Sequence, residues 1–204
     1  SYTDKNILED INLDIYQGDF LLITGPNGGG KTSLLRTILR LQSPTKGRIS
    51  FFRQGEPVSS LDMGYLPQKN SIDSRFPITV EEVVASGLMG NTQKGNTKFD
   101  SKKEIDEMLD LMGITALRNK PIGVLSGGQL QRSLFGRALI SKPEMLILDE
   151  PASYIDRQFG NRMFEILRDL SSNGTTIMMV SHEIEPFITL SNRNLYINHI
   201  LGDR

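Results

Sequence analysis

The chain has no cysteine and no long apolar run, and neither sign of charge dominates it. The lack of cysteine excludes disulfides and thiolate metal sites, which suits a reducing compartment. The longest apolar runs, FLLI, MLIL and IMMV, fall far short of the roughly 18 residues that a membrane-spanning helix requires. With 23 basic and 24 acidic residues, the formal net charge of −1 gives no global attraction to nucleic acid or to an anionic membrane. We therefore expect a soluble chain with no transmembrane segment of its own.

The beginning and the length of the chain set further bounds. The first residues, SYTDKN, contain no methionine, no basic stretch and no apolar segment, so we expect no signal peptide and a shortened N-terminus. A chain of 204 residues can bury one substantial core, or a core and a small subdomain, without covalent support. No internal repeat or low-complexity tract is found in the sequence.

Apolar periodicity predicts several strands. Residues 7–23 alternate as a strand does, with Ile11, Leu13 and Ile15 apolar, and they end in the buried-strand run FLLI. Further strands are predicted in GRISFF, MGYLPQ, MLIL and TTIMMV.

Helices are predicted between these strands. The first runs from about residue 31 to 41, and the second from a capping box of Ser101 and Glu104 to Gly113, after a polar loop at 89–100. A third starts near Gly127, and a fourth has one apolar face formed by Phe159, Met163, Ile166, Leu167 and Leu170. Strands that alternate with helices imply a parallel sheet with right-handed crossovers, and the helical stretch 69–141 reads as an insertion.

A glycine-rich turn joins the first buried strand to the first helix. GPNGGGKT, residues 25–32, matches the P-loop pattern in the strand–turn–helix context that this pattern requires. Glycines let backbone N–H groups converge on phosphate oxygens, Lys31 would reach the β- and γ-phosphates, and Thr32 would ligate Mg²⁺. The alternative is a flexible turn that happens to contain a lysine. The pattern predicts as nucleotide-binding residues Gly25, Pro26, Asn27, Gly28, Gly29, Gly30, Lys31, Thr32 and Ser33.

Two carboxylates follow the apolar run in MLILDEP. Asp149 would hold Mg²⁺, as the acidic residue after an apolar strand does in P-loop NTPases. Glu150 is then free to orient and deprotonate the attacking water. The alternative is an acidic pair that caps a helix, and the upstream P-loop favours the catalytic interpretation.

A second candidate anion site lies about a hundred residues further on, in LSGGQLQRSLFGRAL. Ser126 and the amides of Gly127 and Gly128 stand at a predicted helix start, where an N-terminus attracts an anion. The alternative is a plain helix start, because serine is a favoured N-cap.

Taken in order, these segments resemble the ATPase subunits of ATP-binding cassette (ABC) proteins over nearly the whole chain. The ordered set is GPNGGGKT, Gln68 of GYLPQ, LSGGQ at 125–129, LILDEP, Asp156 of the following loop, and His182 of VSHE. Many families share a P-loop, whereas LSGGQ in this order is highly specific. The resemblance implies an α/β, RecA-like P-loop NTPase fold, with a mostly parallel sheet core, an N-terminal antiparallel β portion and an inserted α-helical subdomain. It implies one domain over 1–204, with a nucleotide-binding core at 1–68 and 142–204 and a helical signature subdomain at 69–141.

The resemblance also assigns roles and a partner. In ABC ATPases two cassettes pack head to tail, so that the signature of one covers the γ-phosphate held by the P-loop of the other. Here that signature is Leu125, Ser126, Gly127, Gly128 and Gln129. The implied catalytic residues are Lys31, Gln68, Glu150 and His182, and Gln68 joins Thr32 and Asp149 as a Mg²⁺ contact.

Two further positions carry over from the family. Tyr2 stands where an aromatic residue stacks on adenine, although a surface tyrosine near a frayed end is the alternative. Asp156 matches an acidic residue that reaches across the dimer, but it lies in EPASYID, which departs from many relatives at 152, 154 and 155. Gly29 and Gly136 replace common small residues without touching the chemistry.

The stretch MGYLPQKNSIDSRFPITVEEVVASGLMG resembles importer ATPases for zinc, manganese and iron chelates. This resemblance implies ATP and Mg²⁺ as cofactors, a second and most simply identical ATPase subunit, transmembrane permease subunits and an extracytoplasmic binding protein. It implies a location at the cytoplasmic face of the membrane, held by the permease, and no nucleic-acid partner.

Two other functions are alternatives to that of a transporter subunit. A soluble ABC protein that acts on translation or DNA maintenance usually carries two cassettes or long insertions, and this chain has neither sustained heptads nor strong charge. A non-hydrolysing adapter would lack the glutamate or the histidine, and Glu150 and His182 are both present.

A docking surface for a short helix of the membrane subunit is predicted within residues 69–100. Phe76, Pro77, Leu88 and Met89 are apolar residues among polar ones, and exposed apolar patches often mark partner sites. The alternative is that these side chains fill the core of their own subdomain.

Overall fold

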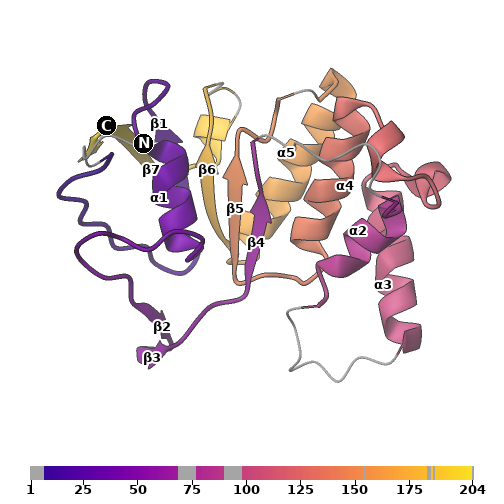
Figure 1. Ribbon diagram of the computed structural model, residues 1–204, viewed down its shortest axis with the longest axis horizontal. Helices are drawn as coiled ribbons and strands as arrows, with labels where there is room; N and C mark the ends of the chain where they lie inside the picture. The colour runs from indigo at the N-terminus through magenta and orange to yellow at the C-terminus, as the bar shows by residue number, and fades with distance from the viewer. Residues whose placement is uncertain are drawn as a thin grey trace.

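A six-stranded sheet forms the centre of the computed structural model, which describes residues 7–68, 77–89, 98–153, 155–182, 185 and 187–203 (Figure 1). The strand order is β4-β5-β6-β1-β7-β8, and each pair is parallel except the last. The strands are β1 Phe20–Thr24, β4 Met63–Leu66, β5 Met145–Asp149, β6 Thr176–Val180, β7 Arg193–Asn198 and β8 Ile200–Asp203. A separate antiparallel hairpin pairs β2 Phe51–Arg53 with β3 Glu56–Val58.

Helices connect and cover the strands. The α-helices are α1 Lys31–Ile38, α2 Val80–Ser86, α3 Lys98–Leu111, α4 Gly127–Leu139 and α5 Arg157–Ser172. Short 3₁₀ turns lie at Thr115–Leu117, Ile122–Val124 and Phe187–Thr189. Figure 1 shows α1 at one side of the central strands, with α5 and then α4 toward the other. The expected fold class, a mostly parallel sheet with a small antiparallel sheet and helices, is confirmed.

Both faces of the sheet are buried. Successive side chains of a strand point to opposite faces, so each strand contributes to both. In β1, Phe20 and Leu22 belong to one hydrophobic cluster, and Leu21 and Ile23 belong to the other. The first cluster also contains the buried side chains of α5, which are Phe159, Met163 and Leu167. The second contains those of α1, which are Leu34, Leu35 and Ile38. The apolar runs that predicted strands are therefore buried from both sides.

Residues 7–19 differ from the expectation. They form no strand, and only the FLLI end of the predicted stretch becomes β1. The alternation is nevertheless real, since Ile11, Leu13 and Ile15 are half-buried against the second cluster while Asn12 and Asp14 are exposed. A strand needs a hydrogen-bonded neighbour as well as an apolar face, and periodicity reports only the face.

The helical stretch between β4 and β5 contains α2, α3 and α4. Helix α3 begins at Lys98, so Ser101 lies inside it, and the predicted capping box with Glu104 does not mark its start. Gly113 follows the end of α3 with a φ of 65°. At Gly136, a Cβ would lie 3.0 Å from Met112 Cγ, so α4 packs closely on the end of α3. The division into a core at 1–68 and 142–204 and a subdomain at 69–141 stays a prediction, because the first cluster draws residues from both.

Gly64 in β4 provides a test of this packing. A Cβ there would lie 2.1 Å from the carbonyl oxygen of Ala138 in α4, so Gly64→Ala forces the strand and the helix apart. We expect it to lower the free energy of unfolding by about 1–3 kcal/mol, measured by urea denaturation. The matched control is Gly160→Ala inside α5, where a Cβ meets nothing within 4 Å. That change should raise stability by about 0.5–1 kcal/mol, and equal effects of the two substitutions would contradict the packing described.

Candidate nucleotide-binding site

The loop between β1 and α1 depends on glycine at two positions. Gly25 has a φ of 143°, and a Cβ there would lie 2.0 Å from the carbonyl oxygen of Ile197 in β7. Gly30 has a φ of 100° and stands before the first turn of α1, where a Cβ would lie 2.4 Å from a methyl carbon of Leu8. No side chain caps this helix start. The amides of the first turn are therefore left to a ligand, at the positive end of the helix dipole.

Lys31 lies against the loop that precedes it. Its side chain is buried, with 7% of the residue exposed. The Nζ atom donates hydrogen bonds to the carbonyl oxygens of Gly25 at 2.8 Å and of Pro26 at 2.9 Å. The structure thus holds an ammonium group inside the glycine loop, where it can meet an anion.

A hydrogen bond joins the start of α1 to the end of β5. Thr32 Oγ1 donates to Asp149 Oδ2 at 3.0 Å, and Asp149 is only 1% exposed. Burial raises the pKa of the Asp149 carboxyl, while the Thr32 hydrogen bond and the nearby Lys31 oppose that rise. The second oxygen, Oδ1, is buried and has no hydrogen-bond partner among the described residues.

These oxygen donors fit a magnesium ion. Mg²⁺ takes oxygen ligands and is usually held by one or two carboxylates together with substrate phosphates. The unpartnered Oδ1 of Asp149 next to the Thr32 hydroxyl provides such a partial set. In the described part of the chain, no group of three or more histidine or acidic residues forms a complete metal cage. The geometry therefore suits an ion that arrives with a phosphate ligand.

Glu150 follows β5 in a left-handed conformation, with a φ of 53°. Its backbone N–H donates to Val180 O at 2.9 Å, which fixes this turn against the end of β6. The residue is 7% exposed, and its Oε2 accepts a hydrogen bond from the His182 backbone at 3.3 Å. A non-glycine residue with positive φ is costly and often occurs where function requires a fixed side chain.

His182 connects this carboxylate to the glycine-rich loop. Its Nε2 lies 2.9 Å from Asn27 Oδ1 and 3.3 Å from Glu150 Oε1, the latter within ion-pair distance but outside hydrogen-bond geometry. The structure thus brings together the loop after β1, the end of β5 and the second residue after β6. All three follow parallel strands at one edge of the sheet, where α/β proteins bind ligands.

The other predicted residues of this site are less fully fixed. Gln68 is exposed two residues beyond the end of β4, whose Leu66 pairs with Leu148 of β5, so it follows the same sheet edge. Ser33 is half-buried in the first turn of α1. Tyr2 lies outside the described residues.

The signature residues lie at the start of α4, away from the P-loop (Figure 1). Ser126 caps α4, with its Oγ accepting from the Gln129 backbone at 3.3 Å, while Gln129 Oε1 accepts from the Ser126 backbone at 3.1 Å. Ser126 and Gly127 are exposed, Gly128 is half-buried, and Leu125 packs against the first cluster. The predicted helix start is therefore right. In Figure 1, α4 and α1 lie on opposite sides of β4 and β5, so one chain does not bring its signature to its own P-loop.

Asp156 has partners inside its own chain that sequence reasoning missed. Its Oδ1 accepts a hydrogen bond from the Phe159 backbone at 3.0 Å and caps α5, and its Oδ2 forms an ion pair with Arg132 of α4. The Phe159 backbone and then Arg132 hold the pKa of Asp156 below its ordinary value. An aspartate before an amphipathic helix is a usable cap signal, whereas Arg132 gave no signal of its own.

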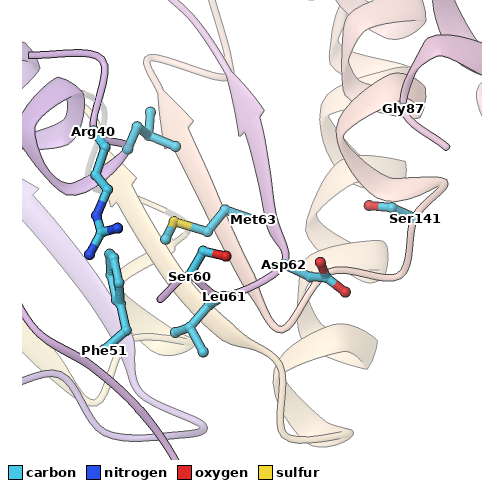
Figure 2. Close-up of a pocket in the computed structure, with 9 residues that line it drawn as sticks. Arg40, Phe51, Ser60, Leu61, Asp62, Met63, Gly87 and Ser141 are labelled. Carbon is cyan, nitrogen blue, oxygen red and sulfur yellow. The ribbon is translucent and has the colours of Figure 1, made fainter. Parts of the chain in front are cut away.

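A hollow of about 360 Å³ lies near the other edge of the sheet, where β4 begins. Figure 2 shows Arg40 and Phe51 at one end, and Gly87 and Ser141 at the other. Its lining comes from the ends of α1, α2 and α4, from β2 and from the approach to β4, as residues Leu39, Arg40, Phe51, Ser60, Leu61, Asp62, Met63, Gly87 and Ser141. No sequence pattern predicts this hollow.

A strand, a glycine-rich loop and a helix, together with a parallel strand of the same sheet that ends in a buried aspartate, define a P-loop nucleotide hydrolase. Residues 8–153 match the ABC transporter family, and the chain belongs to that family. It is an ATP-binding and ATP-hydrolysing subunit of an ABC transporter. In the described part of the chain, every helix is too short or too polar to cross a membrane.

Relatives from several bacteria match most of the chain. A probable metal transport system ATP-binding protein of Chlamydia pneumoniae is 40% identical over 96% of this chain and 81% of its own length. Zinc uptake system ATP-binding protein ZurA of Listeria monocytogenes is 37% identical over 98% of this chain and 78% of its own. Zinc import ATP-binding protein ZnuC of Haemophilus influenzae is 35% identical over 97% and 68%.

Solved structures share the fold. A dimeric post-hydrolysis state of the ATP-binding cassette MJ0796, bound to ADP and Pi, has a TM-score of 0.82 at 25% identity, covering 97% of this chain and 90% of that one. An inward-facing, putative metal-chelate type ABC transporter has a TM-score of 0.75 at 27% identity, covering 96% and 76%.

Because the pKa of Asp149 is raised, we expect its replacement to increase the stability of the free protein and to abolish its ATPase activity. A carboxyl whose pKa is raised on folding destabilises the native state as pH rises, because the unfolded chain loses its proton first. In the protein free of nucleotide and metal, Asp149→Asn should therefore raise the free energy of unfolding at pH 7, by a margin that shrinks as the pH approaches 4. Urea denaturation at both pH values measures this margin, and a variant less stable than wild type at pH 7 would contradict it. The same variant should lose Mg²⁺-dependent ATPase activity.

Proposed function

We propose that this chain supplies the energy for import of a metal ion or metal chelate through a membrane permease. The observation that carries the proposal is the convergence of Lys31, Asp149 and Glu150 at one sheet edge, in a chain of the ABC transporter family. The metal cargo is supported by relatives that are named for zinc import or uptake and for metal transport. A cassette acting on translation or DNA maintenance lacks such support.

The site residues divide the work of phosphoryl transfer. Lys31 and the amides at the start of α1 would bind the β- and γ-phosphates, and Tyr2 would stack on adenine. Thr32, Asp149 and Gln68 would hold Mg²⁺, which when bound neutralises charge on the phosphates. The unpartnered oxygen of Asp149 supports this assignment.

Glu150 would orient and deprotonate the attacking water. Its turn is fixed by β6, and within the described part of the chain Oε1 has no hydrogen-bond partner, so a water could occupy that position. His182 would contact the γ-phosphate beside Glu150, since its Nε2 lies close to both Asn27 of the glycine-rich loop and the Glu150 carboxylate.

A second copy of the chain would complete each site. The N-terminus of α4 is exposed and lies away from the P-loop of its own chain, so its anion-binding end suits the γ-phosphate held by a partner. Two identical chains placed head to tail would give two such sites around a two-fold axis. The signature residues would then cover the partner's nucleotide, with Asp156 beside the same interface.

Replacing the proposed general base tests this function. Glu150→Gln keeps the shape of the side chain but cannot take a proton, so we expect ATP hydrolysis to slow by about 10²–10⁴-fold while ATP binding persists. Because bound ATP is no longer consumed, sedimentation should show this variant as a monomer alone and as a dimer with ATP. Near-normal turnover would contradict the role of Glu150, and a dimer of unchanged shape with and without ATP would contradict nucleotide-driven assembly.

The permease would dock near the hollow at the beginning of β4. Gly87 lines this hollow, and two residues further on Met89 is 82% exposed. Pro77 is also exposed, Leu88 is half-buried against the first cluster, and Phe76 lies outside the described residues. The lining mixes apolar and polar side chains, and Arg40 and Asp62 contribute charges of opposite sign (Figure 2). Such a mixed groove suits a short amphipathic helix.

The docking proposal predicts a selective loss of stimulation. Met89→Glu places a charge on the exposed apolar rim, so in a reconstituted transporter we expect permease-stimulated ATPase to fall about tenfold, with ATP binding unchanged. Ile200→Ser is the matched control, because Ile200 is 60% exposed and lies on β8, the outermost strand on the side of the sheet away from β4. Equal stimulation of wild type and Met89→Glu would remove this surface from consideration.

The remaining partners follow from the same proposal. The permease would hold the chain at the cytoplasmic face of the membrane, and an extracytoplasmic binding protein would deliver the cargo. Metal specificity would then reside in those subunits. The absence of a metal cage among the described residues does not count against a metal cargo, since the cargo need not touch this chain.

A further inference from the structure

The guanidinium of Arg132 in α4 lies at a junction of three helices. It forms an ion pair with Asp156, directly before α5, and it stacks over the Phe159 ring with 4.5 Å between Cζ and the ring centroid. Its Nη1 would lie 3.5 Å from a Cβ at Gly113, so the end of α3 passes beside it. The side chain is 23% exposed. Arginine is suited to this position because its planar group can stack and donate hydrogen bonds at the same time.

The preceding residue makes a second contact with the same segment. Gln131 is 3% exposed, and its Nε2 donates to the carbonyl oxygen of Pro151 at 3.4 Å. Pro151 directly follows Glu150, and Asp156 directly precedes α5. Helix α4 therefore holds both ends of residues 151–156, the segment that links the proposed catalytic carboxylate to α5.

We propose that Arg132 is a positioning residue for ATP hydrolysis, which acts through Asp156 to fix the segment after Glu150 against the signature helix. The inference rests on the roles of Glu150 and Ser126 in the proposed function. Since α4 begins at Gly127, the same rigid helix carries the signature at its N-terminus and Arg132 in its second turn. A shift of α4 caused by the partner's nucleotide would thereby reach the carboxylate that serves the chain's own nucleotide.

The ion pair and the helix cap can be separated experimentally. Asp156→Asn keeps an oxygen that can accept from the Phe159 backbone, because asparagine caps helices as well as aspartate does, but it removes the charge that Arg132 pairs with. Arg132→Gln removes that charge from the other side. Arg132→Lys keeps the charge and loses the planar group over Phe159.

The experiment is a double-mutant cycle on the rate of ATP hydrolysis. We expect Arg132→Gln and Asp156→Asn each to lower kcat by about 3- to 30-fold, with the affinity for a fluorescent ATP analogue within twofold of wild type. The double variant should lose no more than the larger single effect, because both changes break one contact. Arg132→Lys should recover part of kcat. The matched control is Arg168→Gln on the exposed face of α5, which breaks pairs with Glu165 and Asp169 and should leave kcat unchanged.

Three results would overturn the inference. One is a kcat of Arg132→Gln within twofold of wild type. Another is multiplicative losses in the double variant, which would mean that Asp156 acts independently of Arg132, for example across the dimer. The third is loss of ATP binding in step with kcat, which would indicate a purely structural role. Failure of the proposed function is read separately, from turnover of Glu150→Gln, so the two claims can fall independently.

Discussion

The hydrogen bond from Thr32 to Asp149 holds together two parts of the chain on which the whole site depends. One partner opens the helix after β1 and the other ends β5, and β6 lies between those strands in the sheet. The bond can form because the crossovers place β1 and β5 parallel in one sheet, so that the carboxyl ends of both strands lie at the same edge. Burial keeps Asp149 away from water, and none of the residues that the structure describes forms a hydrogen bond with its Oδ1. Burying this carboxyl with one oxygen unpaired costs folding free energy, which a bound cation would offset.

The N-termini of α1 and α4 differ in a way that suits the separate roles proposed for them. At α1, Gly30 leaves the first turn without a side-chain cap, and Lys31 adds a buried positive charge. At α4, Ser126 and Gln129 satisfy each other's backbone groups, and the end is exposed. The first end can enclose phosphates, whereas the second can only add donors to a phosphate presented by another molecule. The proposed head-to-tail pair of chains would use both.

Local chemistry explains what could be predicted from the sequence. Gly25, Gly30 and Lys31 act through backbone conformation and immediate neighbours, and Asp149 follows a run that is buried on both faces, so short segments were sufficient for these residues. The start of α4 was predictable for the same reason, since its capping box spans only four residues.

Tertiary packing decided the features that the sequence did not reveal. Residues 7–19 have the alternation of a strand but no ladder, and Ser101 lost its predicted capping role because α3 begins at Lys98. Arg132 and Asp156 are 24 residues apart, and their contact depends on how α4 meets α5. The hollow near β4 likewise requires the ends of three helices to meet, which no single segment encodes.

The central claim is that each hydrolytic site combines residues of two chains, and mixing two inactive variants tests it directly. Glu150→Gln removes the general base, while Gly127→Asp places a negative charge at the exposed start of α4, where it suits the helix dipole but repels a partner's phosphate. Each variant alone should be nearly inactive. In an equal mixture half of the dimers are mixed and each has one complete site, so ATPase activity should recover to about a quarter of wild type. A mixture no more active than the average of the two variants would contradict a site shared between chains.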